Sequence, residues 1–188
     1  MRFFSLAALF LMTLSLPALA EREDTALIRN SVMGYSGNAM VNQAAGTEHQ
    51  QANVRVIATT GASSARVLQR QDALIAPDRL DARARIQGAA FSNGSGVLGV
   101  NQGSGVGNQQ INALRMVVEA FPESLDDSSL AQHAAPSSSI SAAMPDNGDR
   151  LVEIDDRAFS GSRGVVQLNQ SAGVGNRTAN HLVIRVTP

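Results

Sequence analysis

Apolar and polar residues alternate in several short stretches of this chain, at residues 80–86, 112–118, 152–154 and 180–186. A period of two places successive side chains on opposite faces of a β-strand. Each stretch therefore predicts a half-buried strand. Residues 104–108 and 172–176 lie between such stretches and are rich in glycine and asparagine, which tolerate positive φ angles. These two segments predict turns.

The alternating stretches belong to a sequence that occurs three times. Residues 86–108 reappear without a gap at residues 154–176, and a weaker copy lies 59 residues upstream of the middle one. The shared pattern is G-x-x-x-[VL]-N-Q-x-[AS]-G-x-x-[NH]-x-x-x-N, and each copy reads as strand, bend, strand, turn, strand. One such unit cannot bury its apolar edge alone, whereas stacked units can. The sequence therefore predicts an all-β protein, a three-unit β-solenoid-like repeat stack.

The repeats and the segments between them divide the chain into six parts. The predicted parts are a signal peptide (1–20), an N-terminal repeat (21–57), a linker (58–79), a second repeat (80–118), a low-complexity linker (119–149) and a third repeat (150–188). Glu48 and His49 replace the Gly-Asn pair of the other copies. Terminal repeats of stacked arrays are often atypical because they cap the stack, so we expect the first repeat to be a cap.

The two linkers differ from the repeats in composition. The first has a weak helical pattern of apolar residues, and the second is rich in Ser, Asp and Pro. Such segments lack the apolar surface needed to form a core of their own. We expect disordered or partly helical linkers, with the helical pattern at Val67, Leu68, Leu74 and Ile75.

The N-terminus has the features of a secretory signal peptide. Arg2 precedes an apolar run at residues 3–16, and Ala18-Leu19-Ala20 forms a small-residue cleavage site. A membrane anchor is the alternative, but a run of about fourteen apolar residues is too short to span a bilayer. The sequence therefore predicts a cleaved leader and a mature chain, beginning at Glu21, that is soluble or secreted.

Composition narrows the range of functions. Removing residues 1–20 from the 188 leaves 168, with 14 arginines, no lysine, 16 acidic side chains and no cysteine. A net charge of −2 argues against nucleic acid as a partner, because nucleic-acid binding normally needs a basic surface. The absence of cysteine excludes disulfides. Three of the six phenylalanines lie in the leader, so we expect thin layers of small side chains rather than a bulky core.

The conserved spacing of amide side chains predicts where repeats would contact one another. In parallel strands stacked in register about 4.8 Å apart, each Asn or Gln amide can hydrogen-bond to its equivalents above and below. We expect a first asparagine ladder, a glutamine ladder on the neighbouring face, a second asparagine ladder, and a set of turn glycines. In that order, the residues are Asn42, Asn101 and Asn169; Gln43, Gln102 and Gln170; Asn53, Asn112 and Asn180; and Gly46, Gly105, Gly173, Gly107 and Gly175.

Motifs that suggest catalysis or cofactor binding lack their required context. Residues 94–99 match G-x-G-x-x-G, but they run directly into a predicted strand, whereas a dinucleotide site needs a helix there. His49, His133 and His181 have no spacing typical of metal ligands. No G-x-S-x-G motif accompanies the serines. We therefore expect no enzymatic activity, no cofactor, no metal and no small-molecule substrate.

Residues 100–112 and 168–180 resemble the repeats of Fap-type functional amyloid subunits of Gram-negative biofilm formers and, more distantly, curlin repeats. The resemblance covers the three repeats and none of the linkers. It implies export through the periplasm, then secretion by outer-membrane machinery to the cell surface or beyond. It also implies association with itself or with other fibre subunits in biofilm fibres. Fap subunits generally carry a C-terminal Cys-x-x-Cys, which this chain lacks. A minor subunit, nucleator or adhesin therefore fits as well as a main subunit.

A second function, from a different class, also fits the predicted strands. A periplasmic accessory protein, similar to a chaperone, could cap the strands of a fibre subunit by β-augmentation.

Overall fold

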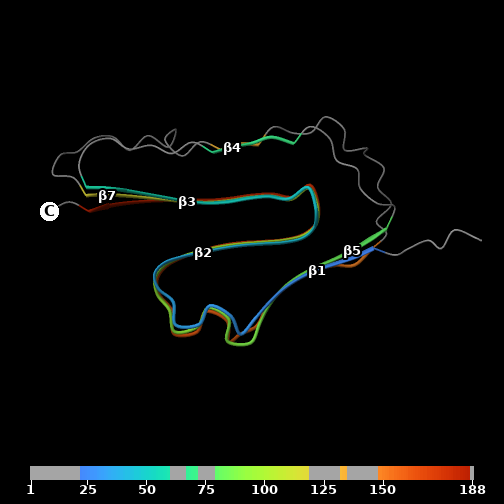
Figure 1. Ribbon diagram of the computed structural model, residues 1–188, viewed down its shortest axis with the longest axis horizontal. Helices are drawn as coiled ribbons and strands as arrows, with labels where there is room; N and C mark the ends of the chain where they lie inside the picture. The colour runs from blue at the N-terminus through green and yellow to red at the C-terminus, as the bar shows by residue number, and fades with distance from the viewer. Residues whose placement is uncertain (1–21, 60–66, 72–78, 119–131, 135–147, 187–188) are drawn as a thin grey trace, which may run out of the picture.

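Three repeats form three rungs of the same shape. The computed structural model describes residues 22–59, 67–71, 79–118, 132–134 and 148–186. In Figure 1 the rungs superpose almost completely, because the view runs along the direction in which they stack. Rung 1 consists of β1 (Arg22–Arg29), β2 (Ser36–Thr47) and β3 (Gln50–Ala58); rung 2 of β5 (Leu80–Gln87), β6 (Ser95–Val106) and β7 (Gln109–Val118); and rung 3 of β9 (Arg150–Ile154), β10 (Arg163–Val174) and β11 (Arg177–Val186).

Each rung is a serpentine of three strands that do not pair with one another. The chain runs along the first strand, through a looped arch, back along the second strand, and through a tight turn into the third (Figure 1). All pairing is between rungs and parallel, which gives three three-stranded sheets in the orders β1-β5-β9, β10-β6-β2 and β11-β7-β3. The predicted all-β repeat stack is confirmed, and the predicted strands at residues 80–86, 112–118, 152–154 and 180–186 are present.

The rungs pair residue for residue. Asn42 lies beside Asn101, and Asn101 beside Asn169, at the sequence offsets of 59 and 68 that the repeats predict. β1 and β5 pair with an offset of 58, since Arg22 lies beside Leu80. The arch of rung 1 is therefore one residue shorter than that of rung 2. An arch can absorb this difference because it contributes no ladder of its own.

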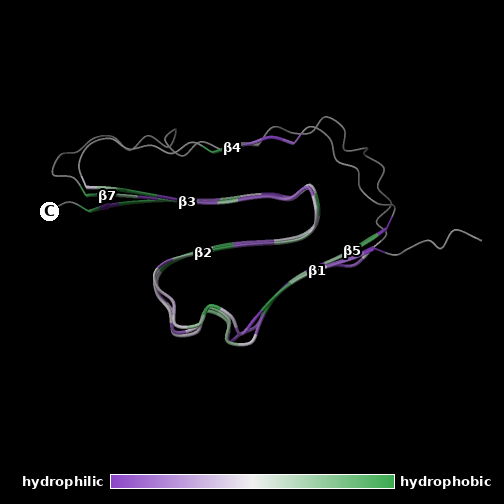
Figure 2. Ribbon diagram, viewed as in Figure 1, coloured by the Kyte–Doolittle hydropathy of each residue, from purple (hydrophilic) through white to green (hydrophobic). Residues whose placement is uncertain are grey.

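The apolar core lies between the first and second strands of each rung, at the arch end. It contains Ile28 and Tyr35 of rung 1 and Ile86, Phe91 and Leu98 of rung 2, all buried. Buried and half-buried residues alternate along β5, so each face of that strand contributes to a different layer. Figure 2 shows apolar and polar stretches following one another along each rung.

The predicted turns at residues 104–108 and 172–176 are too long. β6 continues to Val106 and β10 to Val174, so only Gly107-Asn108 and Gly175-Asn176 turn the chain. The glycine within each strand keeps a positive φ, 108° at Gly105 and 118° at Gly173, without ending the ladder. A residue type that is common in turns is here part of a strand.

The helical pattern predicted in the first linker is wrong where the structure describes it. Val67–Gln69 form a short strand, β4, which pairs in parallel with β8 (Gln132–Ala134) of the second linker. The Gln69 side chain donates to the carbonyl of Gln50 at 3.1 Å, which holds β4 against β3. Leu74, Ile75, the signal peptide and most of the second linker lie outside the described residues. No described segment is a helix of the length and apolarity needed to cross a membrane.

Candidate functional site

The two predicted asparagine ladders form one continuous network. The tight turn between the second and third strands of each rung brings Asn42, Asn101 and Asn169 against Asn53, Asn112 and Asn180. Asn112 Nδ2 donates to Oδ1 of both Asn53 and Asn101, each at 3.0 Å. Asn169 Nδ2 donates to Oδ1 of Asn101 at 3.0 Å and of Asn112 at 3.1 Å. Bonds between rungs and bonds across the two sheets therefore share the same atoms.

The same amides also satisfy backbone carbonyls of the facing sheet. Asn101 Nδ2 donates to Ala52 O at 2.9 Å, and Asn112 Nδ2 donates to Val100 O at 3.0 Å. Both side chains are fully buried. A buried amide without partners is costly, whereas the buried amides of Asn101 and Asn112 bond both to side chains and to carbonyls. The network therefore both joins rungs and fixes their register.

The glutamines form a separate ladder on the opposite face of the same strands. Gln102 Nε2 donates to Gln43 Oε1 at 2.8 Å, and Gln170 Nε2 donates to Gln102 Oε1 at 2.7 Å. Each also bonds to carbonyls of the first sheet, as Gln102 does to Ala26 O at 3.1 Å. The glutamine ladder thus ties the second sheet to the first, and the asparagine network ties it to the third.

Further polar columns were not predicted from the sequence. Asn176 Nδ2 donates to Asn108 Oδ1 at 2.9 Å, and Asn108 Nδ2 donates to Ser104 O at 2.9 Å within its own turn. In a second such column, Gln109 donates to Gln50 and accepts from Arg177, at 3.3 and 3.1 Å. The offsets of 59 and 68 would have identified both columns, had they been applied to every polar residue of the repeat.

Two glycine columns run through the stack, and their backbones approach too closely for any side chain. A Cβ on Gly46 would lie 1.9 Å from Gly105 O, and one on Gly105 would lie 2.1 Å from Gly173 O. These distances are far below van der Waals contact, so glycine is required here by the neighbouring rung. The predicted turn glycines Gly46, Gly105 and Gly173 are thus inter-rung contacts inside β2, β6 and β10, and Gly107 and Gly175 lie in the turns.

The second glycine column lies at the other end of the same strands. It contains Gly37, Gly96 and Gly164. A Cβ on Gly96 would lie 2.0 Å from Gly37 O, and one on Gly164 would lie 2.1 Å from Gly96 O. In this column the clash is therefore with the preceding rung, whereas in the Gly46 column it is with the following rung.

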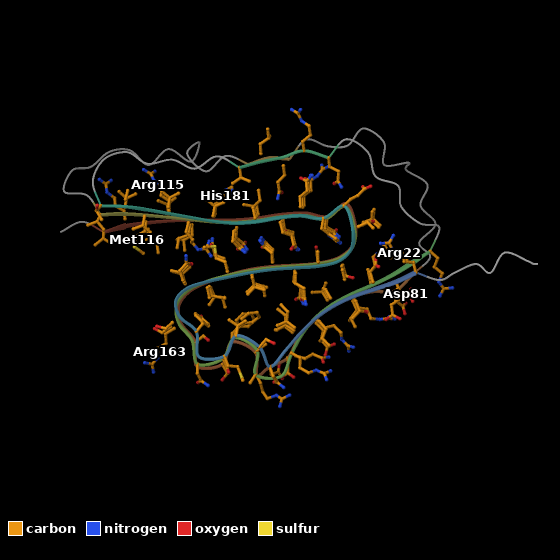
Figure 3. All side chains as sticks on the ribbon, viewed as in Figure 1. Arg22, Asp81, Arg115, Met116, Arg163 and His181 are labelled. Carbon is orange, nitrogen blue, oxygen red and sulfur yellow. The ribbon has the colours of Figure 1, made fainter. Side chains whose placement is uncertain are left out.

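Charged residues are concentrated at the outer edge of the first sheet. Arg83 of rung 2 contacts an acidic side chain of each rung: Glu23 of rung 1, Asp81 of its own rung at 3.8 Å, and Asp149 of rung 3 at 3.7 Å. One cation thus contacts a column of three carboxylates and reduces the repulsion among them. Figure 3 shows Asp81 at this edge, away from the asparagine network.

The arch of rung 3 contains a carboxylate with a shifted pKa. Asp155 accepts hydrogen bonds from the side chain and backbone of Arg157 and from the backbone N–H of Gly88 in rung 2. These bonds hold the pKa of Asp155 well below its usual range, with the Arg157 side chain as the largest cause. A different effect acts on Arg55, whose pKa is lowered by burial.

Nothing in the described part of the chain resembles a metal centre, since no group of three or more His, Asp or Glu side chains is placed to hold an ion. His49 Nε2 lies 3.0 Å from the carbonyl of Ala45, within its own turn. His133 lies in β8, and His181 lies in β11 on the side of the third sheet that faces β4 (Figure 3).

The geometry defines a class of protein: a stack of parallel, in-register rungs joined by amide ladders, which is the arrangement of an amyloid-like fibre. The sequence matches the functional amyloid protein FapB/FapC family over residues 12–187, so the chain belongs to that family. It is therefore a functional amyloid protein, of a structural family that self-associates into extracellular fibres in biofilms. No solved structure matches it.

Proposed function

We propose that this protein is an exported subunit of biofilm fibres, which assembles by adding its three-rung stack to the stacks of other subunits. The asparagine network, the glutamine ladder and the glycine columns would continue from one subunit into the next. Its role would be structural or adhesive, as a main or a minor fibre subunit.

The contrast between the middle rung and the outer rungs supports this proposal most directly. Val100, Asn101 and Gln102 of rung 2 are fully buried, because a rung covers each side. At the equivalent positions of rung 1, Asn42 is exposed and Val41 and Gln43 are half-buried. The outer rungs also expose large apolar residues, such as Met40 at 48 % and Val166 at 41 %. Unpaired strand edges of this kind template the addition of further strands.

Export is the part of the proposal that depends on the N-terminus. Residues 1–20 have the charge, apolar run and cleavage site of a secretory leader. Outer-membrane machinery would then release the mature chain from the periplasm, and assembly would take place at the cell surface.

An accessory role remains the alternative. The same unpaired edges could bind the strands of a different fibre subunit by β-augmentation. The fibre role is favoured because the outer rungs repeat the sequence of the middle rung, and so provide the most closely matched edges for a second copy of this chain.

The decisive experiment uses the purified chain beginning at residue 21. Incubated alone, it should show a concentration-dependent rise in thioflavin fluorescence. The product should give the meridional reflection near 4.7–4.8 Å and the equatorial reflection near 10 Å that cross-β fibres produce. A chain that stays soluble alone but co-assembles with another fibre subunit would support the accessory role instead.

A further inference from the structure

The amide ladders have a direction. In the asparagine network and in the glutamine ladder of residues 43, 102 and 170, each inter-rung amide N–H donates toward the preceding rung, and each amide oxygen accepts from the following rung. A neighbouring column runs the other way, since Gln51 Nε2 donates to Gln110 Oε1 at 2.7 Å and Gln110 Nε2 donates to Ser171 Oγ at 3.0 Å. Gln170 donates to Gln102, and Gln102 donates to Gln43. Asn169 donates to Asn101, and Asn101 donates to Asn42 at 2.9 Å. The two ends of the stack therefore differ chemically.

The direction leaves an acceptor at one end and donors at the other. Gln170 Oε1 is buried and has no hydrogen-bond partner. It occupies the position from which Gln43 Oε1 and Gln102 Oε1 accept in the rungs before it. At the opposite end Gln43 Nε2 reaches only the carbonyl of Leu27, at 2.9 Å, and no amide of a preceding rung. In this ladder an acceptor thus faces outward from rung 3, and a donor faces outward from rung 1.

The glycine columns show the same polarity. Gly37 has no atom within 4 Å of the place where its Cβ would lie, and the equivalent Cβ on Gly96 or Gly164 would strike the preceding rung. Gly173 is the reverse case. A Cβ there would meet only the side chains of Arg150 and Asn176, at 3.0 Å or more, whereas Gly46 and Gly105 would strike the following rung. Gly37 therefore has open space at its Cβ position, and at Gly173 that position meets side chains but no backbone of a following rung.

Charge favours contact between rung 3 of one copy and rung 1 of a second copy. In the first sheet, Asp24 lies beside Ala82, and Ala82 lies beside Arg150. Continuing this register places Asp24 of a second copy beside Arg150 of the first. Opposite charges then meet in a column whose middle position is alanine.

We propose that rung 3 of one copy binds rung 1 of a second copy in this register, and that Gly37 and Gly173 keep the two faces open for each other. The proposal rests on the fibre function above and adds its direction. Growth is polar, each junction joins an acceptor face to a donor face, and each face depends on one glycine. The first repeat is then a junction partner, in contrast to the cap that its sequence predicts.

Single-end capping tests this inference. Gly37→Ala would place a methyl group where the carbonyl of Gly164 from the preceding copy must lie, so it blocks the rung 1 face and leaves the rung 3 face intact. Gly34→Ala is the matched control. Gly34 also has a positive φ, 64°, and no atom within 4 Å of its Cβ position. The corresponding place in the arch of rung 2 is occupied by Asn93, also at positive φ.

Labelled variants are added to wild-type seeds, and growth at each seed end is followed by two-colour fluorescence microscopy. G34A should elongate both ends at the wild-type rate. G37A should bind at one end only and stop growth there. At the end where G37A is bound, the rate of elongation should fall by about tenfold or more, because the added methyl group overpacks the interface with the next subunit. Gly173→Ala should bind only at the other end, and the two variants together should stop both ends.

The outcomes separate the two proposals. If wild-type protein forms no seeds alone, the fibre function is wrong. If wild-type protein grows and G37A elongates both ends as G34A does, the fibre function stands and the polar junction is wrong. If labelled G37A binds at neither end while G34A binds at both, the polar junction is also wrong, because the rung 3 face of G37A is intact and must still bind.

Discussion

The rings of Phe91 and Phe159 stack with their centroids 5.1 Å apart and their planes at 15°. Each occupies the same place in the arch of its rung, with the same φ of 60°. Phe91 is fully buried, whereas one face of Phe159 has no rung beyond it. The first repeat has Val32 in this place, also at positive φ and 39 % exposed. The aromatic pair therefore joins rungs 2 and 3 only.

Truncating either ring should destabilise the protein. The losses from the two truncations should differ in the soluble protein and become similar in the fibre. Phe91→Ala should lower the free energy of unfolding of the soluble protein by about 3–5 kcal/mol, the usual range for a buried phenylalanine. Phe159→Ala should cost clearly less, because its ring is half-exposed. In fibres the next copy covers Phe159, so the two losses should converge. Guanidinium titrations of soluble protein and of fibres measure both, with Val32→Ala as control. Equal losses in the soluble protein would contradict the prediction.

Arg83 is expected to matter more at low ionic strength than at high. Replacing it with glutamine leaves Glu23, Asp81 and Asp149 stacked without their shared cation. All three side chains are partly exposed, so the loss of stability should be modest, about 0.5–1 kcal/mol in dilute buffer. Near 1 M salt the screening length is about 3 Å and the loss should largely disappear. Denaturation midpoints at the two salt concentrations measure this effect. A defect independent of salt would mean that Arg83 acts through packing.

Asp155 should make the stack sensitive to acid. Its pKa is depressed in the folded state, mainly by Arg157. A group with a depressed folded pKa contributes stability that is complete above its unfolded pKa, about 3.9 for aspartate, and is lost as the pH falls through the folded value. Asp155→Asn should therefore be less stable than wild type at pH 5–7, and the difference should shrink below about pH 4. Unfolding titrations across this range, with exposed Asp156→Asn as control, test the assignment.

The repeat offset was sufficient to predict register, but not the contacts between layers. Asn101 pairs with Asn42 and Asn169 as the offsets require. That Asn101 also accepts from Asn112 depends on the turn that folds the third strand onto the second, which brings together residues 11 positions apart. The sequence showed these residues as two ladders because offsets between repeats say nothing about distances within one repeat.

The same limit explains the glycines and β4. Gly105 has the composition of a turn residue. What makes it necessary is the carbonyl of Gly173 in the next rung, a contact that local turn rules do not contain. Val67–Gln69 form a strand because Gln69 bonds to carbonyls of both Gln50 and Gln110, on two different rungs. In both cases tertiary contacts decided between conformations that local sequence left nearly equal.

The asparagine network should fail when amides become carboxylates. Changing Asn101 and Asn169 together to Asp removes their donors to Asn42, Ala52 O and Ile111 O and stacks like charges about 4.8 Å apart. At an effective dielectric of 20 to 40, the repulsion costs roughly 2 to 3.5 kcal/mol per contact. Fibre growth should stop at pH 7. It should partly recover below about pH 4, where protonated carboxyls can donate again. Exposed Asn38→Asp is the control, and thioflavin kinetics give the readout.

Two neighbouring glycines of β6 separate the requirement for close approach from the general cost of losing glycine. A Cβ on Gly105 would lie 2.1 Å from the carbonyl of Gly173, and backbone atoms cannot yield by the ångström or more that is needed. A Cβ on Gly103 would meet only side-chain atoms, at 3.2 Å or more, and the equivalent positions are Ala44 and Ser171, which already carry side chains. Gly103→Ala should therefore change stability by no more than about 1 kcal/mol.

Gly105→Ala should instead separate rungs 2 and 3 and reduce stability by several kcal/mol, at the upper end for single substitutions. Hydrogen exchange measured residue by residue gives the sharpest readout. G105A should lose protection in β10 and β11 while β2 keeps more of its own, because its clash lies between rungs 2 and 3. Similar protection in G103A and G105A would show that the column tolerates a side chain and that the rungs do not approach as closely as Gly105 and Gly173 require.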